Sequence, residues 1–233
     1  MSGIPKDLVI AIDGPVAAGK TTTARLLARR LGYCHIDSGA IYRALAWKAL
    51  QQAVDLSSPT VLANMLEQTT LELQPVPAGL RVLVDGEDVT ESLRLPKTDT
   101  ASSILSTYAS VREEMVRRQR ELGAQGGVVM DGRDIGTVVF PHAAVKFYLT
   151  ASLKERGRRR FLESPQGPGT LESTLEEVES RDRRDMERAV SPLKPAPDAI
   201  LIDTTFLRPE EVVRQMEDHI CRKFKNSHDF FLA

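Results

Sequence analysis

The chain has 233 residues, 42% of them hydrophobic, which is enough to bury one sizeable core, so we expect a single domain over residues 1–233. Its 31 basic residues are balanced by 32 acidic residues, which argues against a nucleic-acid or membrane-surface binder that relies on a global positive field. The sequence contains neither a recognisable signal peptide nor 18 consecutive apolar residues, so we expect no membrane span.

Strands and helices are predicted to alternate from the N-terminus onwards. The β-branched run Leu8–Ile12 predicts a buried strand, Lys20–Leu31 has helical periodicity, and Tyr33–Ile36 predicts a second strand followed by another helix. Later apolar runs of strand length are Gly127–Met130, Val145–Leu149 and Ala199–Ile202. Strands that are apolar on both faces and alternate with helices indicate an α/β fold with a mostly parallel five-stranded sheet.

Two segments depart from this alternation. Between about residues 59 and 96, Leu71–Gln74 and Leu80–Val84 predict the strands of a hairpin, so we interpret this stretch as an insertion on the core. The irregular run Ser164–Gly169 separates two charged helical segments. We interpret residues 155–170 as a lid over a binding site.

Residues Gly14–Thr21 fit the phosphate-loop pattern G-x-x-x-x-G-K-[ST] between a predicted strand and a predicted helix. In such a loop, backbone N–H groups and the positive end of the following helix surround a polyphosphate. We expect Lys20 to reach the outer phosphates and the hydroxyl of Thr21 to bind Mg²⁺. The loop does not by itself identify the reaction, because switches, motors and small-molecule kinases share it.

Charged residues follow two further predicted strands. In Asp37-Ser38-Gly39, Ser38 is predicted to cap the next helix, with Arg43 facing the cleft. The segment Asp131-Gly132-Arg133-Asp134 follows the strand Gly127–Met130. Ligands of open α/β sheets bind at the carboxyl ends of the strands, where these segments and the phosphate loop would converge. Alternatively, Asp37 and Asp131 are only turn residues.

The C-terminal half contains charged helical segments. Arg181, Asp185 and Arg188 recur at helical spacing and therefore share one face. A solvated ladder of salt bridges is the alternative interpretation, for these residues and for the arginines of the predicted lid. The lid arginines suit neutralisation of a transferring phosphoryl group, and we assign Arg156 to that role among Arg156, Arg158, Arg159 and Arg160.

Four stretches in this order resemble the bacterial cytidylate kinases, and the match runs over nearly the whole chain. They are IDGPVAAGKTT, HIDSGAIYRALA, VVMDGRDIGTVVFPHA and RDRRDMERAVSPL. The resemblance implies a three-layer P-loop fold with an inserted monophosphate-binding region at about residues 59–96 and a helical lid. It also implies that the substrate is CMP or dCMP.

The resemblance assigns roles residue by residue. ATP, as phosphate donor, and Mg²⁺ would be held by Gly14, Pro15, Val16, Ala17, Ala18, Gly19, Lys20, Thr21 and Thr22. The 5′-phosphate of CMP would be held by Arg43, Arg133 and Arg188, the sugar by Arg181 and Asp185, and the cytosine by Ser103, Arg112 and Asp134. Ser38 and Asp131 complete the predicted substrate-binding set, and the predicted catalytic residues are Lys20, Arg133, Arg156 and Arg188.

The predicted reaction converts ATP and CMP (or dCMP) into ADP and CDP (or dCDP) in pyrimidine nucleotide metabolism. The alternatives are a kinase for UMP, AMP, dTMP or another acceptor, and a P-loop switch, although no Asn-Lys-x-Asp guanine-reading segment is present. We expect neither nucleic acid nor membrane as a partner. Cys34 and Cys221 lie far apart without C-x-x-C spacing, which favours a reducing, cytoplasmic setting. No apolar stripe beyond the needs of the core is evident, so we expect a monomer.

Overall fold

The computed structural model describes residues 4–76, 79–163 and 169–228. Its main sheet consists of β1 (Val9–Asp13), β2 (Cys34–Asp37), β6 (Val128–Gly132), β7 (Val145–Thr150) and β8 (Ile200–Asp203). The five strands are parallel and stand in the order β2-β6-β1-β7-β8. The predicted α/β fold with a five-stranded sheet is therefore confirmed.

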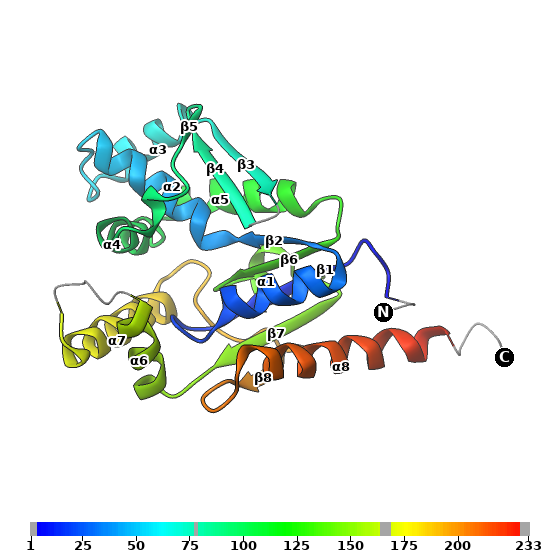
Figure 1. Cartoon of the computed structure of the whole chain (residues 1–233). Coiled ribbons are helices and arrows are strands. Elements are labelled where there is room, and N and C mark those ends of the chain that lie inside the picture. Colours follow the sequence, from blue (N-terminus) through cyan, green and yellow to red (C-terminus); the bar gives the residue numbers. More distant parts are fainter. Residues whose placement is uncertain (1–3, 77–78, 164–168, 229–233) are drawn as a thin grey trace.

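Helices cover both faces of this sheet, which explains why its strands are apolar on both sides (Figure 1). α1 (Lys20–Leu31) and α8 (Pro209–His228) lie on one face, and α5 (Ala109–Gly123) and the single π-helical turn η2 (Ile135–Val139) lie on the other. Successive residues of β1 point to opposite faces. Ile10 and Ile12 pack in one cluster with Leu27 of α1, whereas Ala11 packs in another with Val116 of α5.

A second group of elements lies beside the β2 edge of the sheet (Figure 1). It contains α2 (Ser38–Gln51), α3 (Pro59–Glu67), α4 (Pro96–Leu105) and the short η1 (Ser92–Arg94). It also contains an antiparallel sheet of β3 (Leu71–Val76), β4 (Gly79–Val84) and β5 (Glu87–Asp88). The predicted hairpin is confirmed, and β5 adds a third strand to it.

α2 lies at the centre of this group because it is apolar on two sides. Ile41 and Leu45 pack with α3, α4 and α5, while Ala40 and Ala44 pack against Val82 and other residues of the small sheet. The small sheet and the helices α3, α4 and α5 are thereby packed around α2.

α6 (Leu153–Glu163) and α7 (Leu171–Glu187) form a helix pair beyond the end of β7. A Cβ atom added to Gly157 of α6 would lie 2.3 Å from Cδ2 of Leu175 on α7, so the glycine permits the close approach of the two helices. The tip of the predicted lid, residues 164–168, falls outside the described residues. No helix within the described ranges is both long enough and apolar enough to span a bilayer.

Candidate active site

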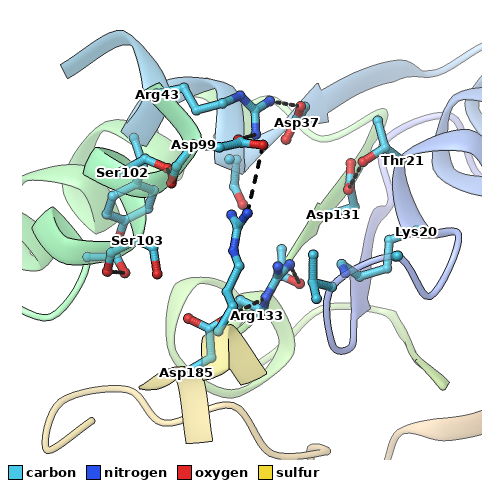
Figure 2. A pocket seen from close by; sticks show the side chains of 18 of the residues that line it. Lys20, Thr21, Asp37, Arg43, Asp99, Ser102, Ser103, Asp131, Arg133 and Asp185 are labelled. Carbon is cyan, nitrogen blue, oxygen red and sulfur yellow. Dashed lines mark hydrogen bonds and ion pairs between the residues drawn. The ribbon is translucent and has the colours of Figure 1, made fainter. Parts of the chain in front are cut away.

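The register of the parallel strands brings the charged segments of the sequence together. Asp13 at the end of β1 stands opposite Gly132 of β6, and Asp37 of β2 stands opposite Asp131 of β6. A cavity of about 430 Å³ opens at this edge of the sheet. Its walls come from the phosphate loop, the start of α2, the segment after β6, and α4 to α7 (Figure 2).

The phosphate loop connects β1 to α1 with little room for substitution. Gly14 has a φ of +150°, and a Cβ atom there would lie 2.1 Å from the carbonyl oxygen of Leu149, so only glycine fits. Lys20 is buried and donates from Nζ to the carbonyl oxygen of Pro15 at 2.6 Å. Burial and, secondarily, the charge of Arg133 lower the pKa of Lys20 to about 7. An anion beside Lys20 would favour its charged form.

Thr21 and Asp131 place two oxygen groups next to the loop. The Thr21 hydroxyl donates to Oδ2 of Asp131 at 2.8 Å, while Oδ1 of Asp131 lies 2.7 Å from Nε2 of His35. Burial opposes charge on His35, but the hydrogen bond to Asp131 and its charge outweigh burial and raise the pKa of His35. In the described part of the chain, no three acidic, histidine or cysteine side chains gather as a metal cluster. A hydroxyl and one carboxylate nevertheless fit Mg²⁺, which needs few protein ligands when substrate phosphates supply others.

Arginines face the cavity from several elements. Arg43 of α2 donates to Oδ2 of Asp37 at 2.6 Å, and Arg133 donates from Nε to Oδ2 of Asp185 at 2.8 Å. Arg188 is buried, and its Nη2 has no hydrogen-bond partner within the described residues. Buried guanidinium groups with unused donors suit a ligand that carries anionic oxygens.

The deep end of the cavity is built around Arg112 of α5. Its Nη2 pairs with Oδ2 of Asp134, its Nη1 donates to the carbonyl oxygen of Ser106 at 3.2 Å, and its guanidinium lies 5.6 Å from the centre of the Tyr42 ring. Ser103 of α4 also lines the cavity, and its hydroxyl oxygen accepts from Arg184 at 3.2 Å. This end offers buried donors and acceptors next to one another, as recognition of a planar polar group requires.

The family model for cytidylate kinase matches residues 10–222 of the chain. The chain belongs to the cytidylate kinase family. It is 53% identical to the cytidylate kinase of Anoxybacillus flavithermus over 89% of this chain and 93% of that protein. It is 48% identical to the cytidylate kinase of Bacillus subtilis, over 94% and 98% of the two chains. A gluconokinase from Sinorhizobium meliloti has the same fold, with a TM-score of 0.51 and 14% identity over 98% of this chain and 99% of that chain.

Family membership confirms the resemblance inferred from the four motifs. Most of the residues that this resemblance singles out line the cavity: Val16, Ala17, Gly19, Lys20, Thr21, Thr22, Ser38, Arg43, Ser103, Arg112, Asp131, Arg133, Asp134, Arg181, Asp185 and Arg188. Gly14, Pro15 and Ala18 are buried in the loop behind them. The predicted cap of α2 is wrong, because Asp37 is the N-cap and accepts from the N–H of Ala40, whereas Ser38 is the first residue of the helix.

Arg156 is not brought into the cavity of this cytidylate kinase family member. Its Nη1 pairs with Oδ2 of Asp182 and donates to the carbonyl oxygen of Val16 at 3.3 Å, so it packs behind the phosphate loop. Arg160, one helical turn further along α6, does line the cavity. The catalytic role assigned to Arg156 stays a prediction, and Arg160 is the arginine of α6 that lines the cavity.

Two acidic residues in and beside the cavity, Asp99 and Asp13, were not predicted as site residues. Asp13 is buried at the end of β1 and accepts from the N–H groups of Ile135 at 2.8 Å and Gly136 at 2.7 Å. It thereby fixes the backbone just after Asp134. The available signal in the sequence was a charged residue directly after an apolar run. Asp99 of α4 also lines the cavity. Nothing in its local sequence distinguishes it from a solvent-exposed helical residue.

Proposed function

We propose that this chain transfers the γ-phosphoryl group of ATP to CMP or dCMP, giving ADP and CDP or dCDP. Membership of the cytidylate kinase family supports this proposal. The observation that carries it is the convergence of Arg43, Arg133 and Arg188 on the cavity that begins at Lys20. A phosphate donor at the loop and a monophosphate at the arginines would share one cavity, as direct transfer requires.

The chemistry needs positioning and charge neutralisation more than covalent help. A phosphate oxygen of the acceptor is already a nucleophile at neutral pH, so no strong general base is required. Lys20 and the arginines would neutralise the charge that spreads over the transferring group. Thr21, together with Asp131, would hold Mg²⁺, which supplies further neutralisation of the donor phosphates when bound.

Base selectivity is proposed to reside at the deep end of the cavity. Cytosine presents acceptors at O2 and N3 and an amine donor at N4. Arg112 can donate to the acceptors, and Asp134 and Ser103 can accept from the amine. Uracil reverses the pattern at N3 and position 4, which would leave buried polar groups unpaired and so disfavour UMP. Arg181 and Asp185 are proposed to hold the sugar.

The two segments outside the alternating core are proposed to serve the acceptor and the transfer step. Residues 59–96 would act as the monophosphate-binding insertion, and residues 155–170 as the lid. The position of Arg160 supports the second assignment, because it extends from the lid helix α6 into the cavity. Closure over the nucleotides would exclude water and limit hydrolysis of ATP.

The test is steady-state ADP formation by the full chain with ATP and Mg²⁺, comparing CMP, dCMP, UMP, AMP and dTMP as acceptors. We expect CMP and dCMP to be phosphorylated with kcat of about 1–100 s⁻¹, and UMP much more slowly. The variant Lys20→Met is the control for contaminating kinases. Fastest turnover of AMP, dTMP or UMP would assign the site to another monophosphate, and no stimulation by any acceptor would leave a nucleotide-dependent switch.

A further inference from the structure

Asp99 lies among the arginines of the cavity. It is on α4, and its Oδ2 accepts from Nη2 of Arg160 at 2.5 Å. Its carboxylate also lies 3.9 Å from Nη1 of Arg43 and 3.9 Å from Nη1 of Arg181. The three arginines come from α2, α6 and α7, so a single carboxylate contacts three helices. Figure 2 shows Asp99 beside Arg43 and across the cavity from Lys20 and Thr21.

Two of the cavity arginines have a close carboxylate partner other than Asp99. Arg43 is paired with Asp37, and Arg133 with Asp185. Within the described residues, Asp99 is the acidic side chain with which Arg181 forms a salt bridge. Burial lowers the pKa of Arg181, and the positive charges of Arg133 and Arg160 lower it further, whereas the carboxylates of Asp99 and Asp185 oppose this change. Asp99 therefore offsets mutual repulsion among the arginines.

We propose that Asp99 is an internal counterion of the arginine cluster, which competes with the phosphate of a bound nucleotide and thereby weakens the binding of that phosphate. This inference rests on the proposed function, because it concerns the site where the acceptor phosphate would bind. A phosphomonoester brings close to two negative charges and three acceptor oxygens at neutral pH, against one charge for the carboxylate. It can therefore replace Asp99 as the partner of the guanidinium groups.

The competition has a thermodynamic consequence. The free energy by which Asp99 stabilises the arginines is lost when these arginines bind a phosphate instead. The binding free energy of that phosphate is less favourable by the same amount. Removing the charge of Asp99 while keeping its shape should therefore tighten the binding of phosphate-bearing ligands. It should not affect a ligand that lacks phosphate.

The experiment is calorimetric titration of the full chain and its Asp99→Asn variant with CMP and with cytidine. We expect the Kd of CMP to fall about tenfold in the variant, within the usual range of coupling between groups, and the Kd of cytidine to stay unchanged. Asp198→Asn is the matched control, because Asp198 is an exposed carboxylate paired with Lys146 away from the cavity. An unchanged or raised Kd of CMP in Asp99→Asn would overturn the proposal, the latter by showing that Asp99 supports binding.

A second measurement separates this inference from the proposed function. Inorganic phosphate should raise the unfolding temperature of Asp99→Asn, or of Asp99→Ser if the first variant folds poorly, by more than it raises that of the unmodified chain. Phosphate bound at the phosphate loop is common to all these proteins, so the difference between them reports on Asp99. Equal shifts would overturn the inference. Failure of the unmodified chain to phosphorylate CMP would overturn the proposed function and leave the phosphate comparison valid.

Discussion

The guanidinium of Arg112 is paired with the carboxylate of Asp134 at the deep end of the cavity, where 2% and 7% of the two side chains are exposed. Removing one member of such a pair leaves a buried charge without a partner and typically costs about 3–5 kcal/mol of stability. We therefore expect Arg112→Met and Asp134→Ala each to destabilise the protein, and their combination to cost less than the sum of the two. Urea unfolding of the two single variants and the double variant checks this prediction.

The same variants test base recognition once stability is accounted for. The variants are compared at a temperature where all of them are folded. Each substitution should lower kcat/KM for CMP by about 100-fold or more, because the base loses its hydrogen-bond partners. The ratio of kcat/KM for CMP to that for UMP should fall as well. The acceptor panel measures both quantities. A preference for CMP that survives in the double variant would place base recognition elsewhere.

Replacing Arg156 and replacing Arg160 with methionine should have different effects on activity and stability. Arg160→Met should lower kcat by about 100- to 1000-fold with little change in stability, because Arg160 lines the cavity. Arg156→Met should instead cost about 3 kcal/mol of stability, because it leaves the buried carboxylate of Asp182 unpaired. Parallel kcat and unfolding measurements compare these matched substitutions. A stable Arg156→Met variant with the larger loss of kcat would restore the catalytic role predicted for Arg156.

Asp13 makes stability depend on pH in a definite direction. Burial raises the pKa of Asp13 from 3.8 to about 7, with a smaller contribution from Asp134, while the N–H groups of Gly136 and Ile135 and the charge of Lys20 oppose the rise. Between about pH 4 and pH 7 the folded protein keeps a proton that the unfolded chain releases. The contribution of protonated Asp13 to the free energy of unfolding is therefore fully present below pH 4 and is lost as the pH rises through 7.

The variant Asp13→Asn should remove this dependence. The free energy of unfolding of the unmodified chain should fall by about 3 kcal/mol more than that of Asp13→Asn between pH 5 and pH 8. Urea titrations at several pH values measure the difference. Parallel profiles would mean that Asp13 is ionised in the folded protein throughout this range.

Gly157 of α6 should tolerate alanine poorly, although alanine favours helices by about 1 kcal/mol over glycine. The added methyl group would meet Leu175 at 2.3 Å, and overpacking of this kind costs about 1–3 kcal/mol. Thermal unfolding of Gly157→Ala measures the loss. The control is the double variant Gly157→Ala with Leu175→Ala. Its loss of stability should be smaller than the sum of the losses in the two single variants. If Gly157→Ala is as stable as the unmodified chain, the two helices are less tightly packed than described.

The parts of the molecule that could be predicted are those whose structure depends on residues close together in the sequence. The phosphate loop is one continuous motif, and the predicted helix Lys20–Leu31 has the bounds of α1. The strand predicted at Leu8–Ile12 lies at Val9–Asp13 instead, because the N–H groups of Ile135 and Gly136 allow Asp13 to be buried. That compensation comes from more than 100 positions away and has no local signal.

The arginines of the site were predictable only in part, for a related reason. Strand ends place Arg43 and Arg133 correctly, because parallel strands bring their carboxyl ends to one edge. On α6, Arg156 and Arg160 lie about one helical turn apart on nearly the same face. Which of them reaches the cavity depends on their partners, Asp182 of α7 for Arg156 and Asp99 of α4 for Arg160, and these partners are distant in the sequence. The association of Asp99 with Arg160 joins helices 61 residues apart in the sequence, which periodicity does not encode.

The carboxylate of Asp182 accepts from the N–H of Val16 at 3.0 Å with one oxygen and pairs with Arg156 through the other. The inner ends of α6 and α7 are therefore tied to the backbone of the phosphate loop. If residues 155–170 act as a lid, as proposed, the lid would have to pivot beyond this tie, and its movement would be confined to the outer turns of the two helices. The phosphate loop and the inner ends of α6 and α7 would then move as one unit, and the phosphates of a bound nucleotide would contact a surface that does not shift when the proposed lid opens.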